Sequence, residues 1–235
     1  MAQPKADINP TGEPADHRVR VARERRDRMR QRLLDAVMAS YGKHLQEGLP
    51  QVEDVVLEAD VSRATFYKYF SSVEQAVDLL GQDMSGDMVR SAQALLDGTE
   101  DPFFQMTTAI QLHLMRATID PVWAAFVARA NTINHDSGSV EAMTAHLTYA
   151  RDQGILAFAD VDAAASLGIG AVSEAMRRMA RKGPLSRSYV DELATMVLMA
   201  FGMERNAARE IVRQRTIFIR GLGPDRLDWW RDPWL

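Results

Sequence analysis

The residues whose types and spacing suggest chemistry lie between Val52 and Phe70, in the stretch VEDVVLEADVSRATFYKYF. Toward its end, cationic, methyl and hydroxyl groups are left facing outward on Arg63, Ala64, Thr65, Tyr67 and Lys68. Proteins use such groups to contact the phosphates and base edges of a DNA duplex. The stretch therefore predicts a surface for nucleic acid.

Two short helices are needed to position these side chains. Apolar residues spaced as one face of a helix occur at Val52, Val55, Val56 and Ala59, and residues 59–61 interrupt that pattern. Ser62 can cap a second helix by accepting a hydrogen bond from an early backbone N–H. In that helix Phe66 and Phe70 are four residues apart and face inward. Two short helices joined by a three-residue turn describe a helix-turn-helix.

An arginine-rich segment precedes this motif. The chain as a whole has a net charge of −4, but residues 17–45 carry nine basic against three acidic side chains. Eight of them are arginines within residues 18–32. Either this segment is a solvated helix face or disordered tail, or it is an arm that contacts phosphates or the minor groove. We favour the arm, with Arg18, Arg20, Arg23 and Arg25 as candidates.

The sequence lacks the patterns of most catalytic and metal sites. It has no cysteine, which excludes disulfides, thiolate metal ligands and a cysteine nucleophile. Its five histidines include no pair three or four residues apart, and no P-loop or G-x-S-x-G sequence occurs. Gly168-Ile169-Gly170 lies within a helical pattern, where close helix packing explains it better than a dinucleotide loop. We therefore expect no enzyme activity, no metal and no cofactor.

The pattern of apolar residues also predicts where the protein is found. No apolar run approaches the roughly 18–20 residues of a membrane span. The N-terminus is polar and then arginine-rich, without an apolar signal region. We expect a cytoplasmic protein without a membrane partner.

The fold is expected to be all-α, with about ten helices and no strand alternation. We expect a disordered tail at 1–16 and a three-helix helix-turn-helix domain with the arginine-rich arm at 17–71. A long helix then joins it to a C-terminal helical bundle, the ligand-binding and dimerisation domain at 72–222. Residues 223–235 are expected to form a C-terminal tail.

Cap residues mark the helix starts. Ser72 and Gln75 form a predicted capping box at the start of the joining helix. Asp101-Pro102 and Asp120-Pro121 each combine a capping aspartate with proline at the first helical position. The predicted caps of the last three helices are Asp162, Ser188 and Asn206.

Apolar helices in the second domain, with few polar groups, predict a small-molecule cavity. Its candidate lining residues are Phe103, Met106, Ile110, His113, Trp123, Phe126, Met143, His146 and Tyr149. Each histidine has two interpretations, as a partly buried ring with satisfied hydrogen bonds or as a polar fixed point for a ligand. Taken alone, the first is the commoner situation.

Two later helices carry more apolar surface than one buried face needs. Ala163–Met179 has a stripe of small residues, and Leu193–Met203 is apolar nearly all round. They form either the centre of one large core or part of a dimeric four-helix bundle. The candidate dimer residues are Leu167, Ala171, Ala175, Met179, Leu193, Val197 and Phe201. The C-terminal Trp229, Trp230 and Trp234 form a binding surface or, as we favour, an anchor for the chain end.

Residues 59–70, ADVSRATFYKYF, resemble the A-G-V-S-x-x-T-[LF]-Y-x-[HY]-F signature of the tetracycline-repressor (TetR) family of transcriptional regulators. The likeness is specific over the N-terminal third and architectural beyond it. It implies a homodimer whose two helix-turn-helices enter successive major grooves of a palindromic operator. It also implies an effector pocket in the C-terminal domain and dimerisation through the last two bundle helices.

The same resemblance implies roles for individual residues. Arg63, Ala64 and Lys68 fall at positions that usually meet base edges, and Thr65, Tyr67 and Tyr69 at positions that usually bind phosphate. Ser62 and Glu53 complete the candidate DNA-binding residues, Glu53 as a possible acceptor from a cytosine amine.

Three positions depart from the family pattern. Asp60 replaces the usual turn glycine, Gln51 replaces a capping threonine, and Val73 replaces a lysine that anchors the DNA backbone. Aspartate tolerates the left-handed conformation better than most residues, so the turn can still form.

Together these observations predict a regulator, most simply a repressor that leaves its operator when a small apolar or amphipathic effector binds. Two other functions remain open: an all-α enzyme acting on a small apolar molecule, and a helix-turn-helix module that docks on proteins. Turnover of a bound compound would support the first. A steep salt dependence of DNA binding would argue against the second.

Overall fold

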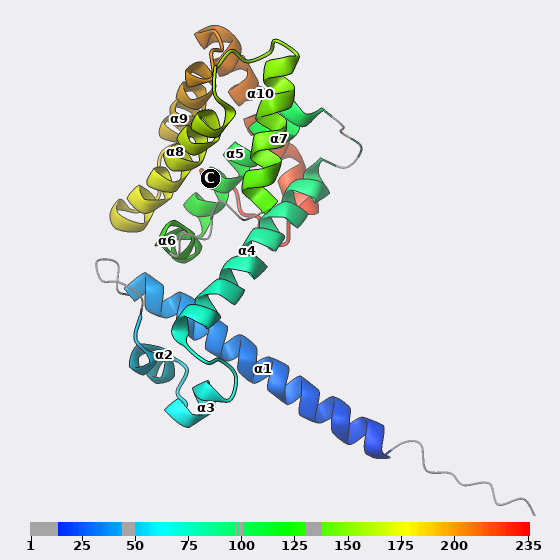
Figure 1. The fold of residues 1–235 in the computed structure, drawn as a ribbon, viewed down its shortest axis with the longest axis vertical. Helices are drawn as coiled ribbons and strands as arrows, with labels where there is room; N and C mark the ends of the chain where they lie inside the picture. The colour runs from blue at the N-terminus through cyan, green and yellow to red at the C-terminus, as the bar shows by residue number, and fades with distance from the viewer. Residues whose placement is uncertain (1–13, 44–49, 97, 99–100, 130–137) are drawn as a thin grey trace, which may run out of the picture.

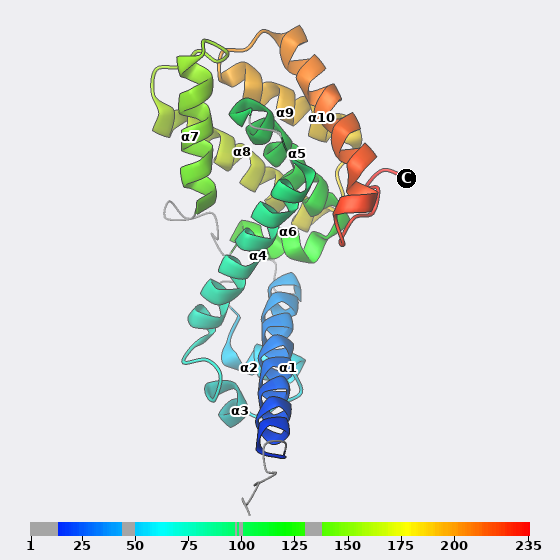
Figure 2. The ribbon, with the colours of Figure 1, turned by 90° about the vertical axis from the view of Figure 1, so that its right-hand side faces the viewer.

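A computed structural model describes residues 14–43, 50–96, 98, 101–129 and 138–235. Within these ranges the chain forms ten α-helices and no strand, which confirms the all-α prediction. The helices are α1 (Pro14–Lys43), α2 (Val52–Glu58), α3 (Arg63–Tyr67), α4 (Val73–Leu95), α5 (Pro102–Ile119), α6 (Pro121–Arg129), α7 (Gly138–Asp152), α8 (Val161–Lys182), α9 (Arg187–Ala200) and α10 (Arg205–Arg226). Figures 1 and 2 show a small N-terminal domain below a larger helical bundle, with α4 running from one into the other.

The N-terminal domain is built on α1, which packs against α2 and α4 and, through its C-terminal end, against α6 of the bundle. Its core includes Leu33, Leu34, Val37, Phe66 and Phe70, each at most 1% exposed. The helix begins at Pro14, within the predicted tail, and residues 22–28 are exposed on every side. The first half of α1 therefore projects beyond the domain (Figure 1). Residues 1–13 of the predicted tail lie outside the described residues.

Four predicted caps are confirmed. The side chains of Ser62, Ser72, Asp101 and Asp120 each accept a hydrogen bond from a backbone N–H two or three residues further on, at 3.0 to 3.2 Å. The capping box at α4 differs in one detail, because Gln75 Oε1 accepts from the Ser71 N–H at 2.7 Å instead of from Ser72. The helix α4 continues through Gly81 and Gly86.

Three predicted caps are wrong by two residues. The structure starts α8, α9 and α10 earlier than Asp162, Ser188 and Asn206 would, with side-chain oxygens of Asp160, Ser186 and Glu204 accepting the first backbone N–H groups. Each earlier residue also carries a capping oxygen, and every residue added to a helix contributes another backbone hydrogen bond. The longer helix is therefore favoured in each case.

The bundle is centred on α5, whose Leu112, Leu114 and Met115 are fully buried. It packs against α4 and α6 through α10. The last helix runs to Arg226, so residues 223–226 of the predicted tail form its final turn.

The three C-terminal tryptophans fasten the chain end onto the bundle, as favoured from the sequence. Trp229 Nε1 donates to Ser91 Oγ of α4 at 3.0 Å, and Trp234 Nε1 donates to the Leu185 carbonyl at 3.3 Å. The guanidinium of Arg116 stacks on the Trp229 ring at 4.5 Å. The segment after α10 thus holds the far half of α4.

Candidate functional site

The helix-turn-helix consists of α2, a turn at residues 59–62 and α3. Asp60 has φ 48°, the left-handed conformation that the family's usual glycine adopts without strain. In place of a capping threonine, Asp54 Oδ2 accepts a hydrogen bond from the Gln51 N–H at 2.8 Å. Phe66 and Phe70 pack together in the core with ring centroids 5.7 Å apart. The departures at Asp60 in the turn and at Gln51 before α2 are therefore accommodated locally.

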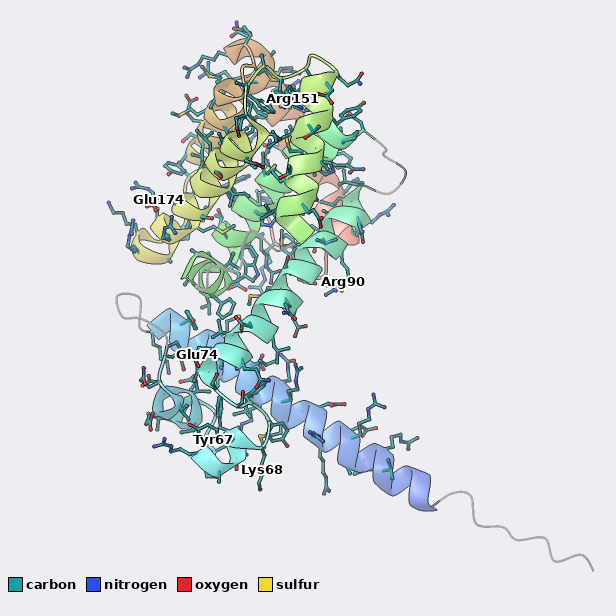
Figure 3. All side chains as sticks on the ribbon, in the orientation of Figure 1. Tyr67, Lys68, Glu74, Arg90, Arg151 and Glu174 are labelled. Carbon is teal, nitrogen blue, oxygen red and sulfur yellow. The ribbon has the colours of Figure 1, made fainter. Side chains whose placement is uncertain are left out.

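The outer side of α3 carries the side chains that the sequence assigned to DNA. Arg63, Ala64, Tyr67 and Lys68 are exposed, whereas Thr65 and Tyr69 are half-buried. In Figure 3, Tyr67 and Lys68 lie at the end of the N-terminal domain that faces away from the bundle. Thr65 Oγ1 lies 2.9 Å from Ser62 Oγ, so these two hydroxyls are engaged in capping α3.

An ion pair joins the two helices of the motif. Arg63 Nη1 lies 2.6 Å from Glu53 Oε1, and both side chains are about 60% exposed. The sequence assigned both to DNA contact but did not predict that they would bind each other. In the free protein, the predicted base-reading arginine is thus held by a carboxylate of α2.

The arginine-rich segment is helical throughout its described part. Arg20 and Arg23 lie 3.8 and 4.0 Å from acidic residues one turn on, and Arg25 is exposed. Arg18 belongs to α1, but its side chain lies outside the described residues. A helix with side chains is about 10 Å wide and the minor groove about 6 Å, so this part of the arm does not fit the groove. A solvated helix face and a phosphate-contacting arm are the two interpretations that remain.

A cavity of about 450 Å³ opens in the bundle between α4, α5, α6, α7 and α8. Six of the nine predicted lining residues surround it: Met106, Ile110, His113, Trp123, Met143 and His146. The other three do not. Phe126 is fully buried against Tyr41 of α1, with ring centroids 4.9 Å apart, and Phe103 is buried in the core. Tyr149 is 38% exposed on α7, away from the cavity.

Sequence reasoning missed the wall that α4 contributes to this cavity. Met84, Met88 and Ala92, each one turn further along, line it with Ser85, Val89, Gln93 and Leu96. The signal was available, because these three residues continue the apolar spacing of α4 beyond the part that packs on the N-terminal domain. Gly168 also lines the cavity and packs against Phe201, which supports the helix-packing interpretation for Gly168, whereas a Cβ at Gly170 would meet no atom within 4 Å.

The two predicted histidines are the polar groups of interest in the cavity wall. His113 Nδ1 lies 2.8 Å from the carbonyl oxygen of Ala109, and its ring centroid is 6.3 Å from that of Trp123. Burial lowers the pKa of His113 below its usual value, and the bond to Ala109 only partly opposes this. Burial likewise lowers the pKa of His146. Both rings are therefore neutral at pH 7.

The predicted dimer residues divide into two groups. Four of them are at most 3% exposed within a single chain and pack in its own core: Ala175, Met179, Val197 and Phe201. The prediction that these four side chains contact a second copy directly is therefore wrong. Leu167 is 48% exposed, and Ala171 and Leu193 are partly exposed. Met196 of α9, which the sequence did not single out, is 58% exposed. An apolar outer face on α8 and α9 thus remains.

Several solved structures share this fold. RolR in complex with resorcinol is 19% identical, with a TM-score of 0.58 over 80% of this chain and 95% of that chain. The fatty acid degradation regulator FadR from Bacillus halodurans is 18% identical, with a TM-score of 0.58 over 72% of this chain and 94% of that chain. The transcriptional regulator FadR from Bacillus subtilis, in complex with stearoyl-CoA, is 15% identical, with a TM-score of 0.60 over 74% of this chain and 99% of that chain.

At these identities the likeness establishes the fold alone. No protein-family model matches the chain, and no curated protein matches its sequence. The TetR assignment therefore stays a prediction. Among the described residues, no helix is long and apolar enough to cross a membrane.

Proposed function

We propose that the chain is a transcriptional regulator of the TetR family, a repressor released from a palindromic operator by a small apolar or amphipathic effector. The observation that carries this proposal is the course of α4. One continuous helix begins three residues after Phe70 and, further along, forms a wall of the cavity. The neighbours add support, since RolR was solved with resorcinol and a FadR with stearoyl-CoA.

The two halves of α4 have different partners. Val73, Ala76 and Val77 are buried near the helix-turn-helix, whereas Met84 and Met88 line the cavity. A helix of 23 residues is about 34 Å long and transmits a tilt of one end to the other. A ligand that prefers one position of the cavity wall therefore biases the position of α3.

On DNA, the outer side of α3 enters the major groove. Arg63 and Lys68 pair with base edges and the Ala64 methyl contacts a base, while Tyr67 and Tyr69 donate to phosphates. Thr65 contributes less than the family pattern implies, because its hydroxyl already bonds Ser62. The helical segment of α1 adds cationic charge along the backbone.

Duplexes selected in vitro from random sequences test this proposal by fluorescence anisotropy. Arg63→Ala is expected to cost about 1–3 kcal/mol of binding and to relax base preference at one position, and Tyr67→Phe to weaken all sequences about equally. Arg213→Ala is the matched control, because Arg213 is also exposed and paired with a glutamate, Glu210 on α10. If Arg63→Ala behaved like the control, α3 would not be the reading helix.

We also propose that two copies associate through the outer face of α8 and α9. Leu167 and Met196 are its most exposed apolar residues, and close packing of two such helix pairs gives a four-helix bundle. Met196→Glu should convert the dimer to a monomer in size-exclusion chromatography with light scattering. Ile217→Glu, on an equally exposed apolar residue of α10, should leave it unchanged. The opposite pattern would move the interface to α10.

A further inference from the structure

Among the described residues that line the cavity, none carries a charged side chain. Its polar members are Ser85, Gln93, Gln105, His113 and His146, and the remainder is apolar. Arg116, which stacks over the Trp123 ring at 5.9 Å, is paired with Asp120 and does not line the cavity. A charged ligand group would lose its hydration here without gaining a counter-charge.

His113 lies among buried members of the cavity wall. Its ring centroid is 6.3 Å from that of Trp123, and Trp123 and Ile110 are each 4% exposed, whereas Val89 on α4 is 42% exposed. A ligand that packs against Trp123 therefore also lies beside His113.

The hydrogen bond to Ala109 fixes what His113 offers. A carbonyl oxygen can only accept, so Nδ1, 2.8 Å away, carries the proton. Because the pKa of the ring is lowered by burial, the ring is neutral and Nε2 has an unprotonated lone pair. Among the described residues, the hydrogen bond of His113 is the one made by Nδ1, which leaves Nε2 available. His113 is therefore an acceptor that a ligand donor can satisfy.

The walls favour an aromatic ring. Four thioethers, from Met84, Met88, Met106 and Met143, surround the same space as the Trp123 indole. Methionine sulfur makes favourable contacts with aromatic rings, and its flexible chain adapts to their outline. The volume of about 450 Å³ is roughly three times that of a cavity of ~150 Å³ that holds one benzene ring. Two or three rings fit.

We propose that the cavity binds a neutral phenol of two or three rings, whose hydroxyl donates to His113 Nε2 and whose rings lie among the methionines. The chemistry of the ligand is inferred from the residues that line the cavity. Only the claim that this ligand regulates DNA binding rests on the proposed function. It excludes carboxylates and phosphates, which would place an unpaired charge beside a neutral ring. It also disfavours ethers, which leave Nε2 without a donor.

Three probes of the same shape test the assignment on the full chain by isothermal titration calorimetry: para-phenylphenol, its methyl ether and biphenylcarboxylate. The phenol is expected to bind about ten- to a hundredfold more tightly than the ether, because the ether leaves a buried acceptor unsatisfied. The carboxylate should bind more weakly than the phenol by at least a similar factor. Equal binding of phenol and ether, tighter binding of the carboxylate, or no binding of the phenol would overturn the proposal.

Two variants locate the discrimination. His113→Leu should bind phenol and ether with equal affinity, whereas Met143→Leu should weaken both by the same factor and keep their ratio. If a variant does not fold, the three probes measured on the unaltered chain still test the proposal. Operator release is measured separately: a phenol that binds as expected without weakening DNA binding would refute the regulatory coupling alone. Release by a charged compound that binds in the cavity would refute the ligand class alone.

Discussion

Replacing Glu53 by glutamine tests whether the ion pair between α2 and α3 restrains DNA binding. The 2.6 Å contact must open before the Arg63 guanidinium can reach a guanine. Because both side chains are largely exposed, the pair contributes only about 0.2–1 kcal/mol. Glu53→Gln removes that cost and one negative charge from the surface proposed to bind DNA. We therefore expect up to about fivefold tighter binding to all duplexes at low salt, with the gain shrinking as salt rises.

The matched control is Glu58→Gln on the same helix. Glu58 pairs with Lys43 and not with Arg63. Glu58→Gln therefore removes the same charge without releasing Arg63 from its ion pair. DNA affinity is measured by fluorescence anisotropy across about 50–200 mM salt for both variants. Both gain affinity from the lost negative charge, and we expect Glu53→Gln to gain more than Glu58→Gln because it also frees Arg63. Equal gains would show that the pair has no influence on binding. A loss above about tenfold, confined to one cytosine position, would show that Glu53 reads a base directly.

Four further predictions concern stability, measured as thermal unfolding. Gly202 has φ 89° and a Cβ there would lie 2.4 Å from a backbone carbonyl oxygen, so Gly202→Ala should cost at least about 3 kcal/mol. Gly170→Ala in open space should stabilise by about 0.5–1 kcal/mol. Trp229→Phe keeps the stacking with Arg116 but loses the hydrogen bond to Ser91, so it should lower the free energy of unfolding by about 1 kcal/mol. The lowered pKa of His113 makes the unfolded chain bind protons more readily, so stability falls as pH drops below about 6.5, and His113→Leu should flatten that fall.

Local chemistry explains which parts of the fold could be predicted. Ser62, Asp101 and Asp120 are predictable caps, because each stands alone before an apolar pattern and its oxygen can meet only the N–H groups that follow. The late helices offer two capping residues two positions apart, as in Asp160-Val161-Asp162. Local propensity does not separate such a pair, and the longer helix is selected by the packing of the whole bundle.

The cavity could be predicted only in part, for a related reason. Periodicity identifies which face of a helix is buried but not which neighbour buries it. Phe126 and Trp123 both belong to the apolar side of α6, yet Phe126 meets Tyr41 of α1 while Trp123 meets the cavity. The difference depends on where α1 ends against α6, some eighty residues away in the chain. The same limit concealed the cavity wall on α4.

The energy needed for regulation is small compared with what this cavity can supply. A ligand that reduces operator affinity a hundredfold must bind the released conformation about 2.8 kcal/mol more tightly than the DNA-bound one. At about 25 cal/mol per Å², that difference equals roughly 110 Å² of apolar surface, less than one buried aromatic ring system. Met84 and Met88 line the cavity and lie on α4, which begins three residues after Phe70 of the N-terminal domain. A change in the apolar surface that a ligand buries against these two side chains is alone of the required size. The coupling therefore needs no rearrangement elsewhere in the bundle.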